Sequence, residues 1–157
     1  MNIDELVVVM REVAKLARVA IAPDALRVET WPAPHRPKGL PFGCMAVYLF
    51  DYAGRILKIG KAGPNSDARY RSQHYNVGSS NSNLAKSLVA DGARIGVIVT
   101  EENVGDWIRE HTTRVNFLLR ADLGIPLLTL MEAFLQCRLA PEFEGFDSQR
   151  VRPSDEV

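Results

Sequence analysis

The sequence predicts one α+β domain, and three observations support this fold class. Two short β-prone runs, Ala46 to Phe50 and Ile56 to Ile59, are separated by a turn-rich interval typical of a hairpin. Segments with helical periodicity lie before and after this pair. The length of 157 residues with 46% hydrophobic content suits one compact domain with a single core rather than two independent domains.

The N-terminal segment predicts an amphipathic helix followed by a linker. From Asp4 to Ala20, apolar residues recur at helical spacing. Three basic residues occupy another face of this helix, namely Arg11, Lys15 and Arg18. We interpret this basic stripe as a solvated face, with phosphate contact as the alternative. Trp31 to Pro41 contains four prolines and predicts an extended linker.

The predicted hairpin has a register that separates two faces. If Phe50 pairs with Ile56, then Tyr48 lies directly opposite Lys58, with Gly60 on the same face. The other face is then fully apolar and consists of Val47, Leu49, Leu57 and Ile59. We expect the apolar face to cover the core and the polar face to carry chemistry.

The remaining segments predict helix, helix, strand, helix and helix. In chain order they are Ser66 to Tyr75, Asn81 to Asp91, Ala93 to Thr100, Glu101 to Leu119 and Ile125 to Leu139. Pro126 is acceptable in the first turn of the last helix, where its missing N–H would have no partner.

Charge is distributed unevenly although the formal net charge is zero. Between Arg36 and Arg71, seven basic residues face only two acidic ones, whereas the chain after Thr100 is net acidic. The zero net charge argues against a protein that coats nucleic acid non-specifically. A polyanion would be attracted to the first half.

Cysteine usage and hydropathy exclude several classes of protein. Cys44 and Cys137 lack the paired spacing of a zinc site, and we expect buried, reduced thiols. No run approaches the roughly eighteen apolar residues that a membrane span requires. The N-terminus lacks a basic leader and a cleavage site, so we expect a cytoplasmic protein without membrane contact.

Glu132 is the strongest single indication of function. It is the only charged residue between Asp122 and Arg138, in an otherwise apolar helix. A buried carboxylate must be hydrogen-bonded, ion-paired or metal-bound, because leaving it bare costs several kcal/mol. Two interpretations stay open, a functional carboxylate or an ion pair with an arginine. The candidate partners are Arg114, Arg120 and Arg138.

Basic and aromatic residues near the hairpin extend the candidate site. Arg69 and Arg71 suit phosphate oxygens, although such pairs are also common on ordinary surfaces. Tyr48 and Lys58 are ordinary strand residues when taken singly. Facing each other, they would lower each other's pKa and prepare one of them to accept a proton from water. His74 is a candidate acid, base or phosphate donor.

In order and spacing, these motifs resemble the GIY-YIG nuclease superfamily. The resemblance covers about residues 43 to 145. Ala46-Val47-Tyr48 is similar to the first motif and Lys58-Ile59-Gly60 to the second. Arg69 on the following helix and Glu132 on a late helix complete the pattern.

The resemblance implies a small three-stranded antiparallel sheet flanked by helices, with an extra N-terminal helix. The implied division is residues 1–42 for the helix and linker, 43–145 for the nuclease domain and 146–157 for a tail. The implied activity is metal-dependent hydrolysis of DNA phosphodiester bonds by an endonuclease. Glu132 would hold one Mg²⁺ or Mn²⁺ ion, Tyr48 would be the general base, and Arg69 would contact the scissile phosphate.

Three positions depart from the family pattern. Lys58 replaces the second tyrosine, as in some restriction-endonuclease branches, where the lysine is a candidate proton acceptor. Gln73 stands where the family often has a histidine, and His74 is the nearest substitute. Glu144 lies near the position of a supporting asparagine.

The expected partner is DNA, with RNA left open. Lys61 and Arg71 are the expected backbone contacts. Arg114 and Asn116 would either read base edges or cap and pair within the fold. Coordinated cutting of both strands by single-site subunits would require a symmetric dimer. The alternative function is an inactive nucleic-acid-binding or protein-interaction domain on the same fold.

Overall fold

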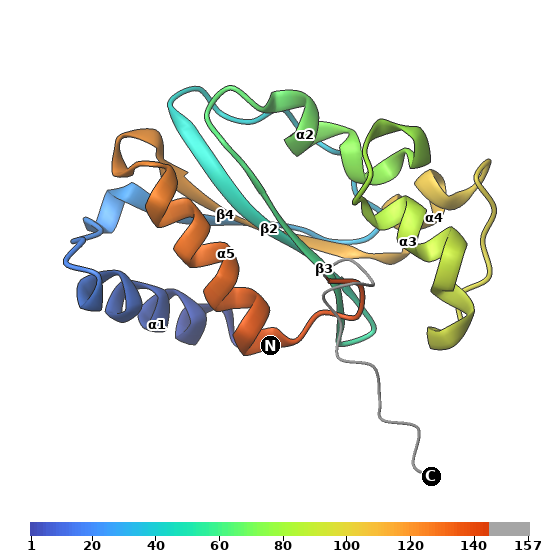
Figure 1. Cartoon of the computed structure of the whole chain (residues 1–157), viewed down its shortest axis with the longest axis horizontal. Coiled ribbons are helices and arrows are strands. Elements are labelled where there is room, and N and C mark those ends of the chain that lie inside the picture. The colour runs from blue at the N-terminus through green and yellow to red at the C-terminus, as the bar shows by residue number, and fades with distance from the viewer. Residues whose placement is uncertain (145–157) are drawn as a thin grey trace, which may run out of the picture.

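The structure, a computed structural model, describes residues 1–144 and has an α+β fold (Figure 1). Its antiparallel sheet has the strand order β1-β4-β2-β3. The strands are β1 (Leu26–Trp31), β2 (Cys44–Tyr52), β3 (Arg55–Ala62) and β4 (Thr113–Arg120). The helices are α1 (Ile3–Leu16), α2 (Asp67–Arg71), α3 (Leu84–Asp91), α4 (Val104–His111) and α5 (Ile125–Leu139). Residues 145–157, which include the predicted tail, lie outside the described part.

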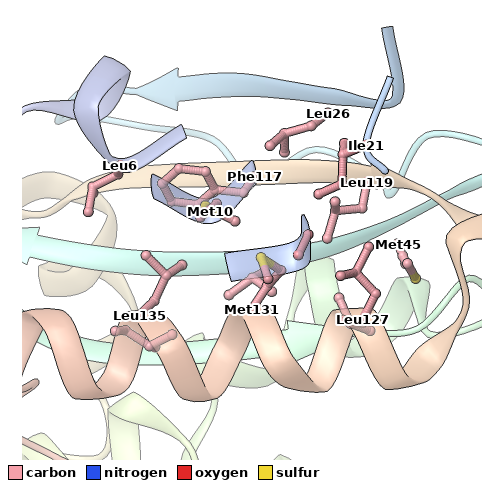
Figure 2. Close-up of a cluster of buried hydrophobic side chains, with 14 of the residues drawn as sticks. Leu6, Met10, Ile21, Leu26, Met45, Phe117, Leu119, Leu127, Met131 and Leu135 are labelled. Atoms are coloured by element: carbon pink, nitrogen blue, oxygen red, sulfur yellow. The ribbon is translucent and has the colours of Figure 1, made fainter. Parts of the chain in front are cut away.

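One face of the sheet carries an apolar core covered by α1 and α5 (Figures 1 and 2). Asn2 caps α1 by accepting a hydrogen bond from the backbone N–H of Glu5. The buried residues of α1 recur once per turn and are Leu6, Met10 and Ala14. They meet Phe117 from β4 and Met131 from α5 (Figure 2). Helical periodicity at the N-terminus therefore builds one side of the core, as expected.

The opposite face is covered by α2, α3 and α4 and has a different chemistry (Figure 1). Its core is rich in aromatic rings, including Trp31, Tyr48, Phe50, Tyr70 and Tyr75. Buried polar side chains come from the strands and loops around these rings. The candidate functional residues on β2 point into this face.

A β-bulge in the β2–β3 hairpin makes the predicted register wrong. Tyr48 pairs with Gly60 and Phe50 pairs with Lys58, while the register shifts between Phe50 and Asp51. The bulge leaves Leu57 without a direct partner and moves it into the aromatic core, away from the apolar face predicted for it. Tyr48 and Lys58 share a face of the sheet but are not direct cross-strand partners.

Within residues 1–144 the sheet has four strands rather than the expected three. The predicted helix over residues 101–119 splits into α4 and β4, and the predicted strand over residues 93–100 is a 3₁₀ turn followed by a loop. β4 misleads the sequence pattern because it buries Arg114 and Asn116 as well as its apolar residues. By contrast, α5 has the bounds expected for it, with Pro126 in its first turn.

The first forty-two residues belong to the same fold as residues 43–144. β1 pairs along its whole length with β4, from Leu26 opposite Leu119 to Trp31 opposite Arg114. Helix α1 packs into the core beneath α5. The predicted boundary at residue 43 therefore separates elements that share one sheet and one core.

Candidate active site

Tyr48 lies in the middle of β2 and is fully buried on the aromatic face. Its partner across the ladder is Gly60 on β3. A Cβ atom at position 60 would lie 2.9 Å from Tyr48 Cε2 and 3.1 Å from His74 Nε2, which is closer than ordinary packing allows. The missing side chain of Gly60 therefore makes the space in which the phenol and the imidazole meet.

His74 is buried in a 3₁₀ turn after α2 and contacts Tyr48 directly. Its Nε2 lies 3.0 Å from the Tyr48 hydroxyl, and its Nδ1 accepts a hydrogen bond from the Leu84 backbone N–H at 3.2 Å. Burial, followed by the charges of Arg114, Lys58 and Arg69, holds the pKa of His74 well below its usual value. The neutral ring therefore carries its proton on Nε2 and donates it to the phenol oxygen.

The Tyr48 phenol is the centre on which several charges act. Burial raises the pKa of Tyr48 to about 12, whereas the positive charges of Arg114 and Arg69 lower it. The negative charge of Glu132 raises it. Arg69 from α2 and Glu132 from α5 thus lie within electrostatic reach of one hydroxyl. At neutral pH this hydroxyl retains its proton.

Glu132 is paired with a lysine that the sequence interpretation did not consider. Its Oε2 lies 2.6 Å from Lys61 Nζ, and its side chain is 16% exposed. An ion pair, one of the two interpretations that the sequence left open, is therefore observed, but within residues 1–144 its cation is Lys61 near the end of β3 and not Arg114, Arg120 or Arg138. Within residues 1–144 Lys61 is the only hydrogen-bond partner of Glu132, which leaves Oε1 open to another ligand.

Glu132 could bind a divalent ion only as a single carboxylate ligand. Among residues 1–144, no cluster of three or more His, Cys, Asp or Glu side chains has a geometry that would hold a metal. Mg²⁺ is often bound by one or two carboxylates together with water and substrate phosphates, so a dense cluster is not required. A partly exposed carboxylate with one open oxygen fits this type of site.

Lys58 is buried on the same face as Tyr48, but its amine is directed to the end of the described chain. Lys58 Nζ donates to the backbone oxygen of Phe143 at 2.7 Å and lies 3.9 Å from Glu144 Oε1. Its charge contributes to the low pKa of His74. Lys58 therefore acts on the site through the effect of its charge on His74, and not through a direct pair with Tyr48.

Residues 142–144 close the open edge of β3. The backbone N–H groups of Glu142 and Phe143 donate to the carbonyl oxygens of Ile56 and Leu57, both at 2.9 Å. Glu144 accepts from the Ile59 N–H at 3.0 Å and from Gln136 Nε2 at 2.9 Å. Glu144, noted from the sequence as a departure, therefore supports the strand that carries Gly60 and Lys61.

The short helix α2 presents arginines to solvent. Arg69 and Arg71 are exposed, and Arg71 Nε lies 3.6 Å from Asp67 Oδ2 in a solvent-screened pair. Asp67 also accepts a hydrogen bond from the Leu40 N–H at 2.7 Å, which ties α2 to the loop before β2. Arg69 is therefore open to solvent on α2, while its positive charge acts on the Tyr48 phenol.

Arg114 and Asn116 cannot read base edges in this structure. Both lie on β4 and have no exposed surface. Arg114 Nε donates to Asn116 Oδ1 at 2.9 Å, and Asn116 Nδ2 donates to the backbone oxygen of Glu29 at 3.3 Å. Of their two predicted roles, pairing within the fold is the one observed. The alternative prediction, that these two residues contact nucleic acid, is wrong for this structure because both side chains are buried.

Sequence reasoning missed the groups that surround Arg114. His35 Nδ1 lies 2.9 Å from the Thr112 backbone oxygen, and His35 Nε2 lies 2.9 Å from the Tyr75 hydroxyl. Tyr75 Oη in turn accepts a hydrogen bond from Arg114 Nη1 at 3.2 Å. The only available signal was the density of aromatic and basic residues after β3, since β4 itself was interpreted as a helix.

Comparison with protein-family models, curated proteins and solved structures finds no match to the chain. No helix among residues 1–144 combines the length and the apolar character needed to cross a membrane. The arrangement of residues is therefore the basis for assigning a function.

Proposed function

We propose that this chain is a GIY-YIG-type metal-dependent endonuclease that hydrolyses DNA phosphodiester bonds. The observation that carries the proposal is the Tyr48 hydroxyl, which lies over Gly60 and contacts His74 at 3.0 Å. Arg69 and Glu132, from two other elements, act electrostatically on the same hydroxyl. The phenol and the imidazole are therefore in contact, and the guanidinium and the carboxylate act on the same hydroxyl through their charges.

In the proposed reaction, Tyr48 as phenolate accepts a proton from water. The water oxygen forms a bond to phosphorus, the bond from phosphorus to the leaving oxygen breaks, and solvent protonates that oxygen. The hydrogen bond from His74 Nε2 favours the phenolate, because hydrogen bonding to a charged form stabilises it. Arg69 neutralises charge on the phosphate with its forked N–H groups.

Glu132 is the residue that would hold Mg²⁺ or Mn²⁺ through its open oxygen. The bound ion would supply positive charge at the phosphate oxygens. Lys61 Nζ lies 2.6 Å from the other oxygen of Glu132 and orients the carboxylate. Lys61 and Arg71 are the further cations proposed to meet the DNA backbone.

The first test is plasmid cleavage with added Mg²⁺ or Mn²⁺. Wild-type protein should nick or linearise the plasmid, and Glu132→Gln should reduce the rate by at least about a hundredfold. Glu110→Gln is the matched control, because it removes the same charge from an exposed site on α4. Equal cleavage by wild type and Glu132→Gln, at equal melting temperature, would contradict the assignment as a metal-dependent nuclease.

The second test is the pH dependence of the cleavage rate. A general base must be deprotonated, so below its pKa of about 12 the active fraction of Tyr48 rises tenfold for each pH unit. The rate should therefore increase with pH from 6 to 9. Tyr48→Phe should lose both the rate and this slope, whereas Tyr52→Phe on the same strand should keep them.

The burial of Tyr48 and the ion pair at Glu132 favour one alternative function. Tyr48 is fully buried and protonated at neutral pH, and Lys61 already neutralises Glu132. Such a site would suit a nucleic-acid-binding or protein-interaction domain without turnover. A binder would retard DNA with a steep dependence on salt concentration and leave it intact when metal is present.

A further inference from the structure

Arg114 is a fully buried cation with no carboxylate beside it. Among residues 1–144, no acidic side chain lies within ion-pair distance of its guanidinium. Nε donates to Asn116 Oδ1 and Nη1 donates to Tyr75 Oη, while Nη2 is buried without a hydrogen-bond partner in the described structure. An arginine cannot lose its charge in a protein, so this positive charge is permanent.

Aromatic rings take the place of a counter-ion. The guanidinium carbon lies 4.3 Å from the ring centre of Tyr48, 4.6 Å from that of Tyr70 and 4.9 Å from that of Trp31. Phe50 is slightly farther away, at 5.3 Å. The electron-rich face of a ring attracts a desolvated cation without cancelling its charge. The nearest ring belongs to the proposed catalytic tyrosine.

This arrangement is unfavourable for stability taken alone. A buried charge without an acid partner costs free energy, and apolar replacements of buried ionic groups are often neutral or stabilising. Unlike an apolar residue at this position, the charge of Arg114 would attract an anion. The phenolate of Tyr48 would be the anion that Arg114 otherwise lacks.

We propose that Arg114 is a positioning residue that acts through Tyr48, its enclosed guanidinium stabilising the phenolate and fixing the ring over Gly60. The part of this proposal that concerns catalysis rests on the proposed function, in which Tyr48 accepts a proton. Arg114 itself touches neither solvent nor substrate. Its action is electrostatic and depends on the absence of an acid at its side.

Other groups face Tyr48 from each neighbouring element. His74 donates to its hydroxyl, Tyr70 lies edge-on at 5.7 Å between ring centres, and Arg69 and Glu132 act on its charge. Among the positive charges, Arg114 has the largest effect in lowering the Tyr48 pKa. A test must therefore change Arg114 or its neighbour while leaving these four groups in place.

The sharpest variant is Asn116→Asp, which is nearly isosteric and gives Arg114 a carboxylate at the 2.9 Å contact. Arg114→Met removes the charge and keeps a similar volume. The ionisation of Tyr48 is followed in the full chain by ¹⁹F NMR after site-specific replacement with difluorotyrosine, whose lower intrinsic pKa keeps the titration in a mild pH range. Asn103→Asp is the matched control on an exposed loop.

Both test variants should raise the measured pKa by about one unit or more, and Asn103→Asp should leave it unchanged. An unchanged pKa in folded Asn116→Asp overturns the proposal, whether or not Arg114→Met folds. This readout does not require cleavage. A raised pKa in a chain that never cuts DNA supports the electrostatic role and contradicts the nuclease assignment, whereas cleavage with an unchanged pKa contradicts only the role of Arg114.

In the active protein, Asn116→Asp should also displace the rise of kcat to higher pH by the same amount. KM should change less than twofold, because Arg114 does not reach the substrate. A loss confined to melting temperature, with the pH profile in place, would overturn the proposal in favour of a purely structural residue.

Discussion

The two faces of the sheet are built from alternate residues of the same strands, yet their interiors differ in kind. The face under α1 and α5 is an apolar core, filled by residues such as Met10, Phe117 and Met131 (Figure 2). The face under α2, α3 and α4 buries His35, His74 and other polar groups among aromatic rings. One face stabilises the fold by removing apolar surface from water. The other holds charges and protons in fixed positions, at a cost in stability.

The apolar face should show the largest effect on stability. Phe117→Ala should reduce the free energy of unfolding by about 3–5 kcal/mol, because it leaves a cavity between the sheet and both helices. Phe42→Ala is the matched control, since Phe42 is fully exposed, and it should change stability by less than about 0.5 kcal/mol. Urea denaturation measures both. Similar losses in the two variants would contradict the assigned core.

On the polar face, the loss of a single oxygen atom should reduce the free energy of unfolding by the next largest amount. Tyr75→Phe removes the oxygen that joins His35 Nε2 to Arg114 Nη1, and it leaves these two buried nitrogen atoms without that hydrogen-bond partner. We expect a loss of about 2–3 kcal/mol in urea denaturation. Tyr52→Phe, on a half-buried tyrosine of β2, is the control. A loss below about 0.5 kcal/mol would mean that the network does not form.

Gly60→Ala tests the contact between the two motif strands. The added methyl group would overlap Tyr48 and His74, and we expect a loss of about 1–3 kcal/mol together with loss of cleavage. Gly78→Ala meets only Asn76 Oδ1 at 3.8 Å and should be close to neutral. Full cleavage activity in Gly60→Ala would show that the contact between Tyr48 and His74 is dispensable.

The buried histidines predict an effect of a different kind, a dependence of stability on acidity. Burial lowers the pKa of both His74 and His35, so the unfolded chain binds more protons than the folded one below about pH 6.5. Their contribution is complete above that pH and is lost as the pH falls toward the folded pKa values. The slope should reach about 1.4 kcal/mol per pH unit for each histidine.

Urea denaturation from pH 8 to pH 5 measures this slope. His74→Gln should make it shallower, whereas the exposed His111→Gln should keep the wild-type profile. Equal slopes in wild type and His74→Gln would contradict the assignment of a neutral, buried His74.

Prediction from the sequence succeeded where local periodicity and burial agree. Helix α5 has the expected bounds, and α1 has the expected buried stripe. It failed at β4, because alternation with Arg114 and Asn116 did not fit a strand covered on both faces. It also failed at the hairpin register, since a bulge adds a residue that composition does not reveal.

The candidate site could also be predicted only in part, because local sequence does not reveal contacts between distant residues. Tyr48, His74 and Glu132 were identified as residue types in an order along the chain, and their chemistry follows from their side chains alone. Whether two of them touch depends on strand register and on the packing of helices. That information comes from contacts between residues far apart in sequence, such as Tyr48 with His74 and Lys61 with Glu132.

Local sequence patterns were sufficient to predict the mixed α+β class, the amphipathic helix at the N-terminus and the isolated carboxylate at Glu132. These follow from periodicity and from the cost of burying a charge, which are local properties. The pairing of Lys61 with Glu132, and the position of Arg114 against the Tyr48 ring with no acidic partner among residues 1–144, follow only from the tertiary structure. A charge acts over distances in space, and folding sets those distances.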